Sequence, residues 1–180
     1  MNTEVSSLSL TAGALYLFVV IATLAAAATA KSHRQQVWHL RSWLLLAVLF
    51  GLLIALRLLD AEEVMRENLR AFLRADSTYA SRRSFQGPLS AGLIAVFCIV
   101  SFAWIYKVGR RINGKRNIAV AVAVAGGFAM IFLISLRMVS LHTVDSFLYG
   151  PLKLNWVADL GLTCLAGGAA CAYIGRVFRR

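Results

Sequence analysis

The chain has 180 residues, of which 59% are hydrophobic, and its mean hydropathy of +0.71 lies well above that of an average soluble protein. Apolar runs of bilayer length use up most of the chain, which excludes a separate soluble catalytic domain. The net charge of +11 comes from Lys and Arg in short loops between the apolar runs, and this scatter argues against nucleic acid as a partner. We therefore predict one transmembrane domain over residues 1–180.

Five apolar runs predict an all-α, polytopic bundle of about five transmembrane helices. The first run is expected to be a retained helix rather than a signal peptide, because no basic residue precedes it. The second is short for a span, and tilt would accommodate it. The five predicted spans are residues 10–30, 43–59, 89–108, 118–136 and 154–175.

Loop charges predict an N-terminus outside and a C-terminus in the cytoplasm. This orientation places a large group of Lys and Arg residues in the cytoplasm with no acid among them, and puts all eight acids outside or near the outer interface. The cytoplasmic group comprises Lys31, Arg34, Arg41, Lys107, Arg110, Arg111, Lys115, Arg116, Arg176, Arg179 and Arg180.

Small residues in the last two apolar runs predict close helix packing, since lipid supplies no hydrophobic drive between helices. Gly126 and Gly127 lie in the fourth run, and Gly161, Gly167 and Gly168 lie in the fifth. The three cysteines, each inside an apolar run, are interpreted as packing residues.

A helix on the outer interface is predicted at about 61–75. Asp60 and Glu63 have the spacing of a capping box, and Met65 and Leu69 begin an apolar stripe at helical spacing. Arg57 precedes this helix near the end of the second span. Its guanidinium either reaches the interface or pairs with a carboxylate such as Asp159.

Two further outward segments carry candidate site residues. Arg82, Arg83 and Gln86 precede the third span, where their donors could bind a phosphate or carboxylate, or anchor the chain at the interface. His142 and Asp145 share a helix face after the fourth span, and they are the candidate catalytic acid/base pair.

His142 and Asp145 are also candidate ligands of a transition metal ion, but two ligands are too few for a metal site. The further ligands would have to come from Glu62, Glu63, Glu67 or Asp159, and an ordinary hydrogen-bonded pair is the preferred interpretation. Asp159 is more informative, because a carboxylate one turn inside an apolar helix is costly unless it is paired or functional. With Asn155 on the same stripe, Asp159 predicts a polar pocket that opens outward.

The order R-R-x-x-Q at Arg82–Gln86, S-x-H-x-x-D at Ser140–Asp145, and then Asn155 and Asp159, resembles a family of small polytopic bacterial inner-membrane proteins. The similarity covers roughly the last two thirds of the chain. It implies a bacterial inner-membrane setting and outward polar residues that act together, and it implies no activity.

The resulting hypothesis is a multi-pass inner-membrane protein with an outward pocket that binds a metal ion or an anionic lipid-type ligand. Its ligand-binding candidates are Arg57, Arg82, Arg83, Gln86, Asn155 and Asp159. The alternative is a non-catalytic accessory subunit whose partners are membrane lipids and other membrane protein subunits. Whether the chain is an enzyme stays open at this point.

Overall fold

The computed structural model describes residues 7–58, 92, 94–104, 106 and 114–179, apart from the segment 140–153. The described residues form four long helices and one short helix, Ile94–Trp104. All four long helices are apolar and long enough to cross a membrane, which indicates a membrane protein. The long helices are α1 (Ser7–Ser32), α2 (Val37–Leu58), α5 (Lys115–Val139) and α7 (Leu154–Phe178).

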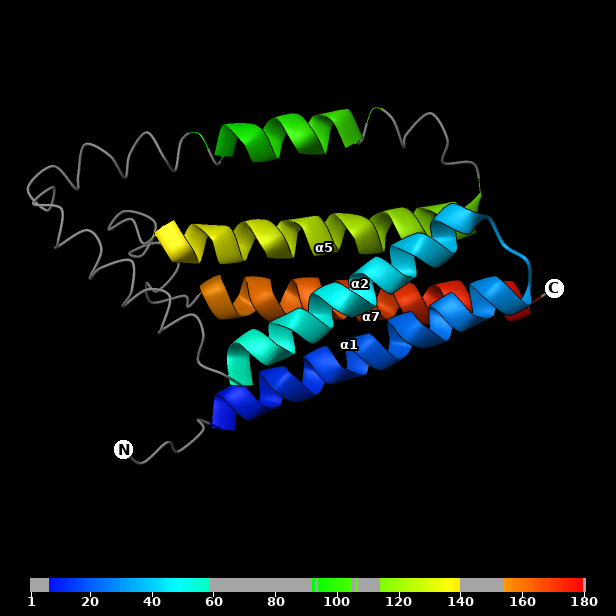
Figure 1. Cartoon of the computed structure of the whole chain (residues 1–180), viewed down its shortest axis with the longest axis horizontal. Coiled ribbons are helices and arrows are strands. Elements are labelled where there is room, and N and C mark those ends of the chain that lie inside the picture. The colour runs from blue at the N-terminus through cyan, green and yellow to red at the C-terminus, as the bar shows by residue number, and fades with distance from the viewer. Residues whose placement is uncertain are drawn as a thin grey trace, which may run out of the picture.

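The long helices form one elongated bundle in which the chain runs back and forth (Figure 1). α1 packs against both α2 and α7, and α5 packs against α7 and, less extensively, α2. The end of α1, the start of α2, the start of α5 and the end of α7 meet at one end of the bundle. We name this the basic end, and the opposite end, where α7 begins, the Asp159 end.

The helix bounds agree with four of the predicted spans, with one informative difference. α2 begins at Val37 rather than at residue 43, because the polar segment before Trp43 is helical and buries His39. Within the predicted third span the structure describes the helix Ile94–Trp104, which flanks α5 through stacking of Phe97 on Phe132 at 3.9 Å. The predicted interfacial helix at 61–75 lies outside the described residues.

A tight turn joins α1 to α2 and places Gln35 at the basic end. The amide of Arg34 donates to Lys31 O at 3.2 Å, and the amide of Gln35 donates to Ala30 O at 2.9 Å. This pair of bonds is the Schellman pattern, which needs a left-handed residue, and Arg34 supplies it with φ 48°.

The bundle core uses small residues where helices approach closely. Ala22, Ala26 and Ala30 follow one face of α1 and are buried. A side chain added at Gly127 would meet Leu46 Cδ2 at 2.6 Å, and one added at Gly167 would meet Phe18 and Val19 at 3.3 Å. These two glycines have the predicted packing role.

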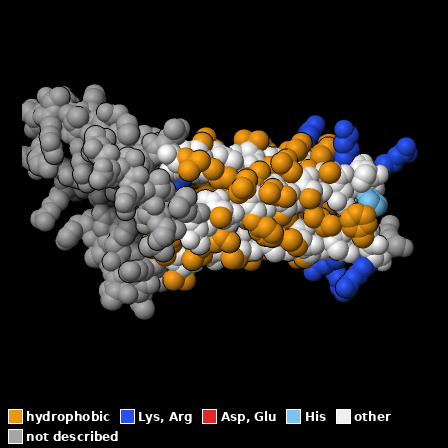
Figure 2. Space-filling view, turned by 90° about the horizontal axis from the view of Figure 1, so that it is seen from below, with side chains coloured by type: hydrophobic (Ala, Val, Ile, Leu, Met, Phe, Trp, Pro, Cys, Tyr) orange, Lys and Arg blue, Asp and Glu red, His pale blue; other side chains and the backbone are white. Residues whose placement is uncertain are grey.

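Other small residues face outward, contrary to expectation. Gly161 and Gly168 have open space where a Cβ would lie, and Cys164 and Cys171 are exposed. Figure 2 shows that the face of the bundle in view is apolar along most of its length. Large exposed side chains such as Leu45 and Val48 are typical of a surface in contact with lipid.

Candidate functional site

A buried carboxylate ties three helices together at the Asp159 end. Asp159 of α7 is 3% exposed, and its Oδ1 accepts a hydrogen bond from the Tyr16 hydroxyl of α1 at 2.5 Å. Arg57 of α2 lies 3.4 Å from Asp159 Oδ2 and donates to Tyr16 Oη, also at 3.4 Å. The pairing of Arg57 with Asp159 that the charge pattern suggested is therefore present.

The surroundings of Arg57 explain why the ion pair is tolerated inside an apolar bundle. The guanidinium lies over the rings of Trp156, at 5.2 Å, and Tyr16, at 5.9 Å, so aromatic faces replace part of its water shell. The carboxylate receives a hydroxyl donor as well as the cation, which offsets its desolvation. Because the charges of Arg57 and Asp159 cancel, this cluster acts as a crosslink between α1, α2 and α7.

The predicted polar stripe on α7 contains a second buried residue, which bonds within its own helix. Thr163 is buried, and its hydroxyl donates to the carbonyl oxygen of Asp159 at 2.7 Å. The side chain of Asn155 lies outside the described residues. Asp159 and Thr163 thus serve helix packing, and the outward pocket expected around them stays a prediction.

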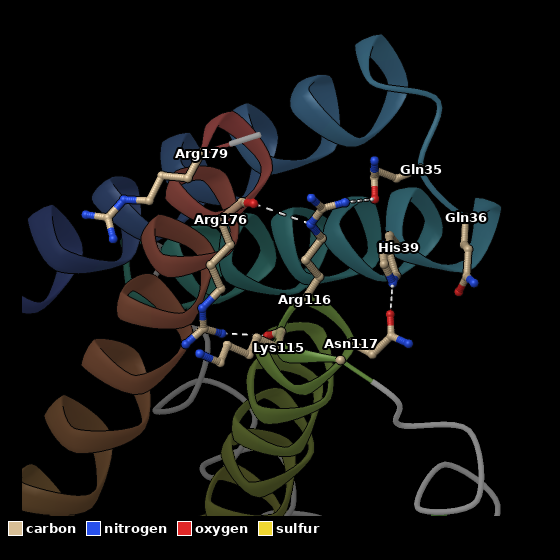
Figure 3. A pocket seen from close by; sticks show the side chains of 9 residues that line it. Gln35, Gln36, His39, Lys115, Arg116, Asn117, Arg176 and Arg179 are labelled. Carbon is tan, nitrogen blue, oxygen red and sulfur yellow. Dashed lines mark hydrogen bonds between the residues drawn. The ribbon is translucent and has the colours of Figure 1, made fainter.

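The basic end holds a recess with a volume of about 840 Å³. Three segments far apart in the sequence form it: the turn between α1 and α2, the start of α5 and the end of α7 (Figure 3). Its walls include three amides, one imidazole and several cationic side chains. The lining residues are Gln35, Gln36, His39, Gly114, Lys115, Arg116, Asn117, Arg176 and Arg179.

Two arginines of the recess are fixed by backbone oxygens instead of carboxylates. Arg116 Nε donates to Arg176 O at 3.3 Å, and Arg116 Nη1 donates to Gln35 Oε1 at 3.3 Å. Arg176 Nη1 donates to Lys115 O at 2.6 Å. Figure 3 shows Arg116 and Arg176 beside one another, while Arg179 extends away from the other labelled side chains. Each of these two arginines thus bonds to the backbone of the other helix and ties α5 to α7 at the basic end.

A buried histidine forms the inner wall of the recess. His39 is 2% exposed; its Nε2 lies 2.9 Å from Asn117 Oδ1, and its Nδ1 lies 3.1 Å from the hydroxyl of Tyr173. A ring that donates from Nε2 to Asn117 and accepts at Nδ1 from Tyr173 satisfies both contacts. Tyr173 also packs on Trp43 at 5.2 Å, so His39 connects the recess to the bundle core.

Charge is distributed unevenly between the ends of the bundle. Among the residues that the structure describes, Asp159 is the single acid, and it lies at the far end from the recess. Figure 2 shows Lys and Arg side chains concentrated at the basic end of the face in view. The cations of the recess therefore have no carboxylate partner within the described part of the chain, a chemistry suited to binding an anion.

No protein-family model matches the chain, and no curated protein or solved structure is similar to it at a significant level. The geometry of the two ends therefore carries the functional interpretation. The resemblance to small bacterial inner-membrane proteins stays a prediction.

Most sequence-predicted site residues lie outside the described part of the chain. This applies to the candidate metal and acid/base residues and to the loop before the third span, namely Glu63, Glu67, Arg82, Arg83, Gln86, His142 and Asp145. Within the described residues, no group of three or more His, Cys, Asp or Glu side chains could hold a metal ion. Arg57 and Asp159 are the two candidates that the structure brings together.

Two important residues were absent from the sequence-based candidates. Tyr16 lies in an apolar run, where a single hydroxyl gives no signal of a buried partner on α7. His39 lies between the first two predicted spans, where the charged residues around it indicate only the side of the membrane. Helical periodicity continued back from Trp43 to His39, four residues earlier, would have placed His39 on the buried face.

Proposed function

We propose that the chain is an integral membrane protein that binds an anionic ligand of the lipid-headgroup type, and that the basic recess holds the anion. Four long apolar helices support the membrane part of this proposal. The observation that carries the ligand class is the recess of about 840 Å³, where Lys115, Arg116 and Arg176 gather without a carboxylate from the described residues.

The donor set of the recess suits a phosphate group. Each guanidinium has five N–H donors in a planar fork, and the hydrogen bonds within the described residues use two donors of Arg116 and one of Arg176. The remaining donors can bind phosphate oxygens in pairs, and the amide groups of Gln35 and Gln36 add neutral donors to the lining.

The location of the recess supports a headgroup rather than a ligand in the bundle centre. The recess lies at the ends of apolar helices, where a headgroup region would meet the protein. By the positive-inside rule we assign the basic end to the cytoplasmic face of a bacterial inner membrane. Anionic lipids of that leaflet attract basic segments at short range.

Thermal unfolding of the purified, detergent-solubilised protein tests the proposal with inorganic phosphate as the probe. Phosphate should raise the midpoint of unfolding above its value in chloride at the same ionic strength, because a ligand of the folded state stabilises it. The increase should disappear in the double variant Arg116→Gln/Arg176→Gln.

A matched control separates binding from general salt effects, since phosphate also stabilises proteins by exclusion from their surfaces. Lys31→Gln/Arg41→Gln removes two exposed charges from the same end without changing the recess lining. This control should keep the full phosphate effect. Equal phosphate effects in both double variants would contradict the proposal.

The metal-binding alternative depends on His142, Asp145, Glu63 and Glu67, so it stays a prediction. Elemental analysis of the purified protein beside His142→Ala tests it, because a transition metal held by that side chain should be lost in the variant. The role of an accessory subunit also stays a prediction, and native mass spectrometry of co-purifying chains tests it.

A further inference from the structure

An apolar groove runs along the outer surface between α5 and α7. It has a volume of about 330 Å³ and begins at the basic end of the bundle. The small residues Gly168 and Ala172 leave its floor open, and a Cβ added at Gly168 would meet no atom within 4 Å. Its walls are formed by Ile118, Ala119 and Val122 of α5 and by Cys164 and Leu165 of α7.

The groove continues from the basic recess. Arg176 lines both, so a single cationic side chain stands where the recess ends and the groove begins. From Arg176 back to Cys164 the groove follows α7 for roughly 18 Å, at about 1.5 Å of rise per residue. The hydrocarbon core is about 30 Å thick, so this length is close to the depth of one leaflet.

We propose that the groove holds an acyl chain of the ligand whose headgroup occupies the recess. The ligand is then an anionic glycerophospholipid and not a soluble phosphate compound. This inference rests on the proposed function of the basic recess. Charge complementarity favours an anionic headgroup at Arg116 and Arg176. The adjoining apolar groove, about as long as one leaflet is deep, can hold the acyl chain attached to that headgroup.

The groove contributes selectivity more than affinity. Bulk lipid already surrounds the bundle with hydrocarbon, so an acyl chain gains no hydrophobic transfer energy when it enters the groove. The gain comes from closer contact with the groove walls, and each contact is weak. Headgroup charge should therefore dominate binding, and blocking the groove should reduce it by a smaller factor.

Two glycine variants of α7 provide a matched test of the groove. Gly168→Leu places a side chain inside the groove, whereas Gly161→Leu places the same side chain two turns away on the same helix, outside the groove lining. Both positions are open to the exterior, so neither substitution forces the bundle apart. The two proteins differ chiefly in whether the groove is filled.

Native mass spectrometry with long-chain phosphatidylglycerol as the probe measures how much lipid each protein retains. Wild type and Gly161→Leu should retain lipid equally, and Gly168→Leu should lose about fivefold in occupancy, the factor expected from losing roughly ten carbon contacts. Equal retention by the two glycine variants would overturn the groove inference. Arg116→Gln/Arg176→Gln should lose more lipid than Gly168→Leu does.

The effect of inorganic phosphate on thermal unfolding distinguishes a wrong groove assignment from a wrong anion site. If Gly168→Leu keeps both the phosphate effect and full lipid retention, the anion site stands and the groove assignment is wrong. If wild type shows no phosphate effect and its lipid retention is insensitive to Arg116→Gln/Arg176→Gln, both proposals are wrong.

Wild-type protein offers a second measurement that does not depend on a variant folding. A phosphatidylglycerol with a photoreactive acyl chain should crosslink mainly to 118–122 of α5 and 164–172 of α7. Excess phosphatidylglycerol should compete with the crosslink, and phosphatidylcholine should compete less. Crosslinks spread evenly over the exposed faces of all four long helices would contradict the groove assignment.

Discussion

The charged side chains at the two ends of the bundle have opposite kinds of partner. At the Asp159 end, a carboxylate, a phenol and a guanidinium from three helices satisfy one another within the chain. At the basic end, Arg116 and Arg176 depend on backbone oxygens and an amide, and the described residues supply no acid. The first arrangement is self-sufficient and stabilises the fold, whereas the second has charge available for a ligand. Each variant below alters one end and leaves the other as a reference.

The largest expected effect comes from breaking the ion pair at the Asp159 end. Asp159→Leu leaves the Arg57 cation beside aromatic rings without its carboxylate and should lower the free energy of unfolding by about 3–5 kcal/mol. Adding Arg57→Met removes the cation as well as the carboxylate and should recover most of the loss. Unfolding in mixed micelles measures the stability of the single and double variants. A double variant as unstable as the single one would show that the remaining cation does not cause the loss of stability.

The next largest effect is expected at the inner wall of the recess. His39→Leu leaves the buried hydroxyl of Tyr173 and the amide of Asn117 without their shared partner, at a cost of about 1–3 kcal/mol. In a Tyr173→Phe background the same substitution should cost less, because one of the two contacts is already absent. A double-mutant cycle in thermal unfolding checks this, and strict additivity would argue against the His39 network.

A smaller loss is expected from Tyr16→Phe, which deletes one hydroxyl and keeps the ring. The carboxylate of Asp159 retains Arg57, so the loss should be about 1 kcal/mol, within the range measured for hydrogen bonds between membrane helices. Unfolding of the variant beside wild type measures it. If Tyr16→Phe lowers the free energy of unfolding as much as Asp159→Leu does, the hydroxyl and not the ion pair is the main stabilising contact between these helices.

The smallest effect is a gain at the turn between α1 and α2. Arg34 adopts a left-handed conformation that costs a non-glycine residue about 1–2 kcal/mol. Arg34→Gly removes this cost but adds chain entropy to the unfolded state, so the net gain should be below about 1 kcal/mol. Thermal unfolding should show a small increase for Arg34→Gly and none for Arg34→Ala. Arg34 does not line the recess, so the phosphate effect should persist in both.

Hydropathy alone is enough to predict the four long helices. In lipid, backbone N–H and C=O groups must form their hydrogen bonds within the helix, and the side chains of the helix must be apolar, so each span is visible as an apolar run. Hydropathy missed the start of α2, where His39 and Arg41 made the first turns look like a loop. Burial of His39 depends on Tyr173 and Asn117, which are distant in sequence. Such contacts have no local signal.

The candidate site was predictable only in part for the same reason. The cost of a carboxylate within an apolar helix pointed to Asp159 and to a cation such as Arg57, and the pair is present. Tyr16 could not be found without knowing which face of α1 meets α7. The basic residues were visible in the sequence, but a recess requires three separate segments to meet, and loop charge reports only their side of the membrane.

One measurement tests the contrast between the ends most directly: the midpoint of thermal unfolding in phosphatidylcholine nanodiscs as phosphatidylglycerol is added. Wild type should gain stability as the anionic lipid increases. Tyr16→Phe should start lower and gain as much, because its change lies at the self-sufficient end, while Arg116→Gln/Arg176→Gln should gain little. A full gain in the arginine variant, or its loss in Tyr16→Phe, would contradict the assignment of ligand binding to the basic end.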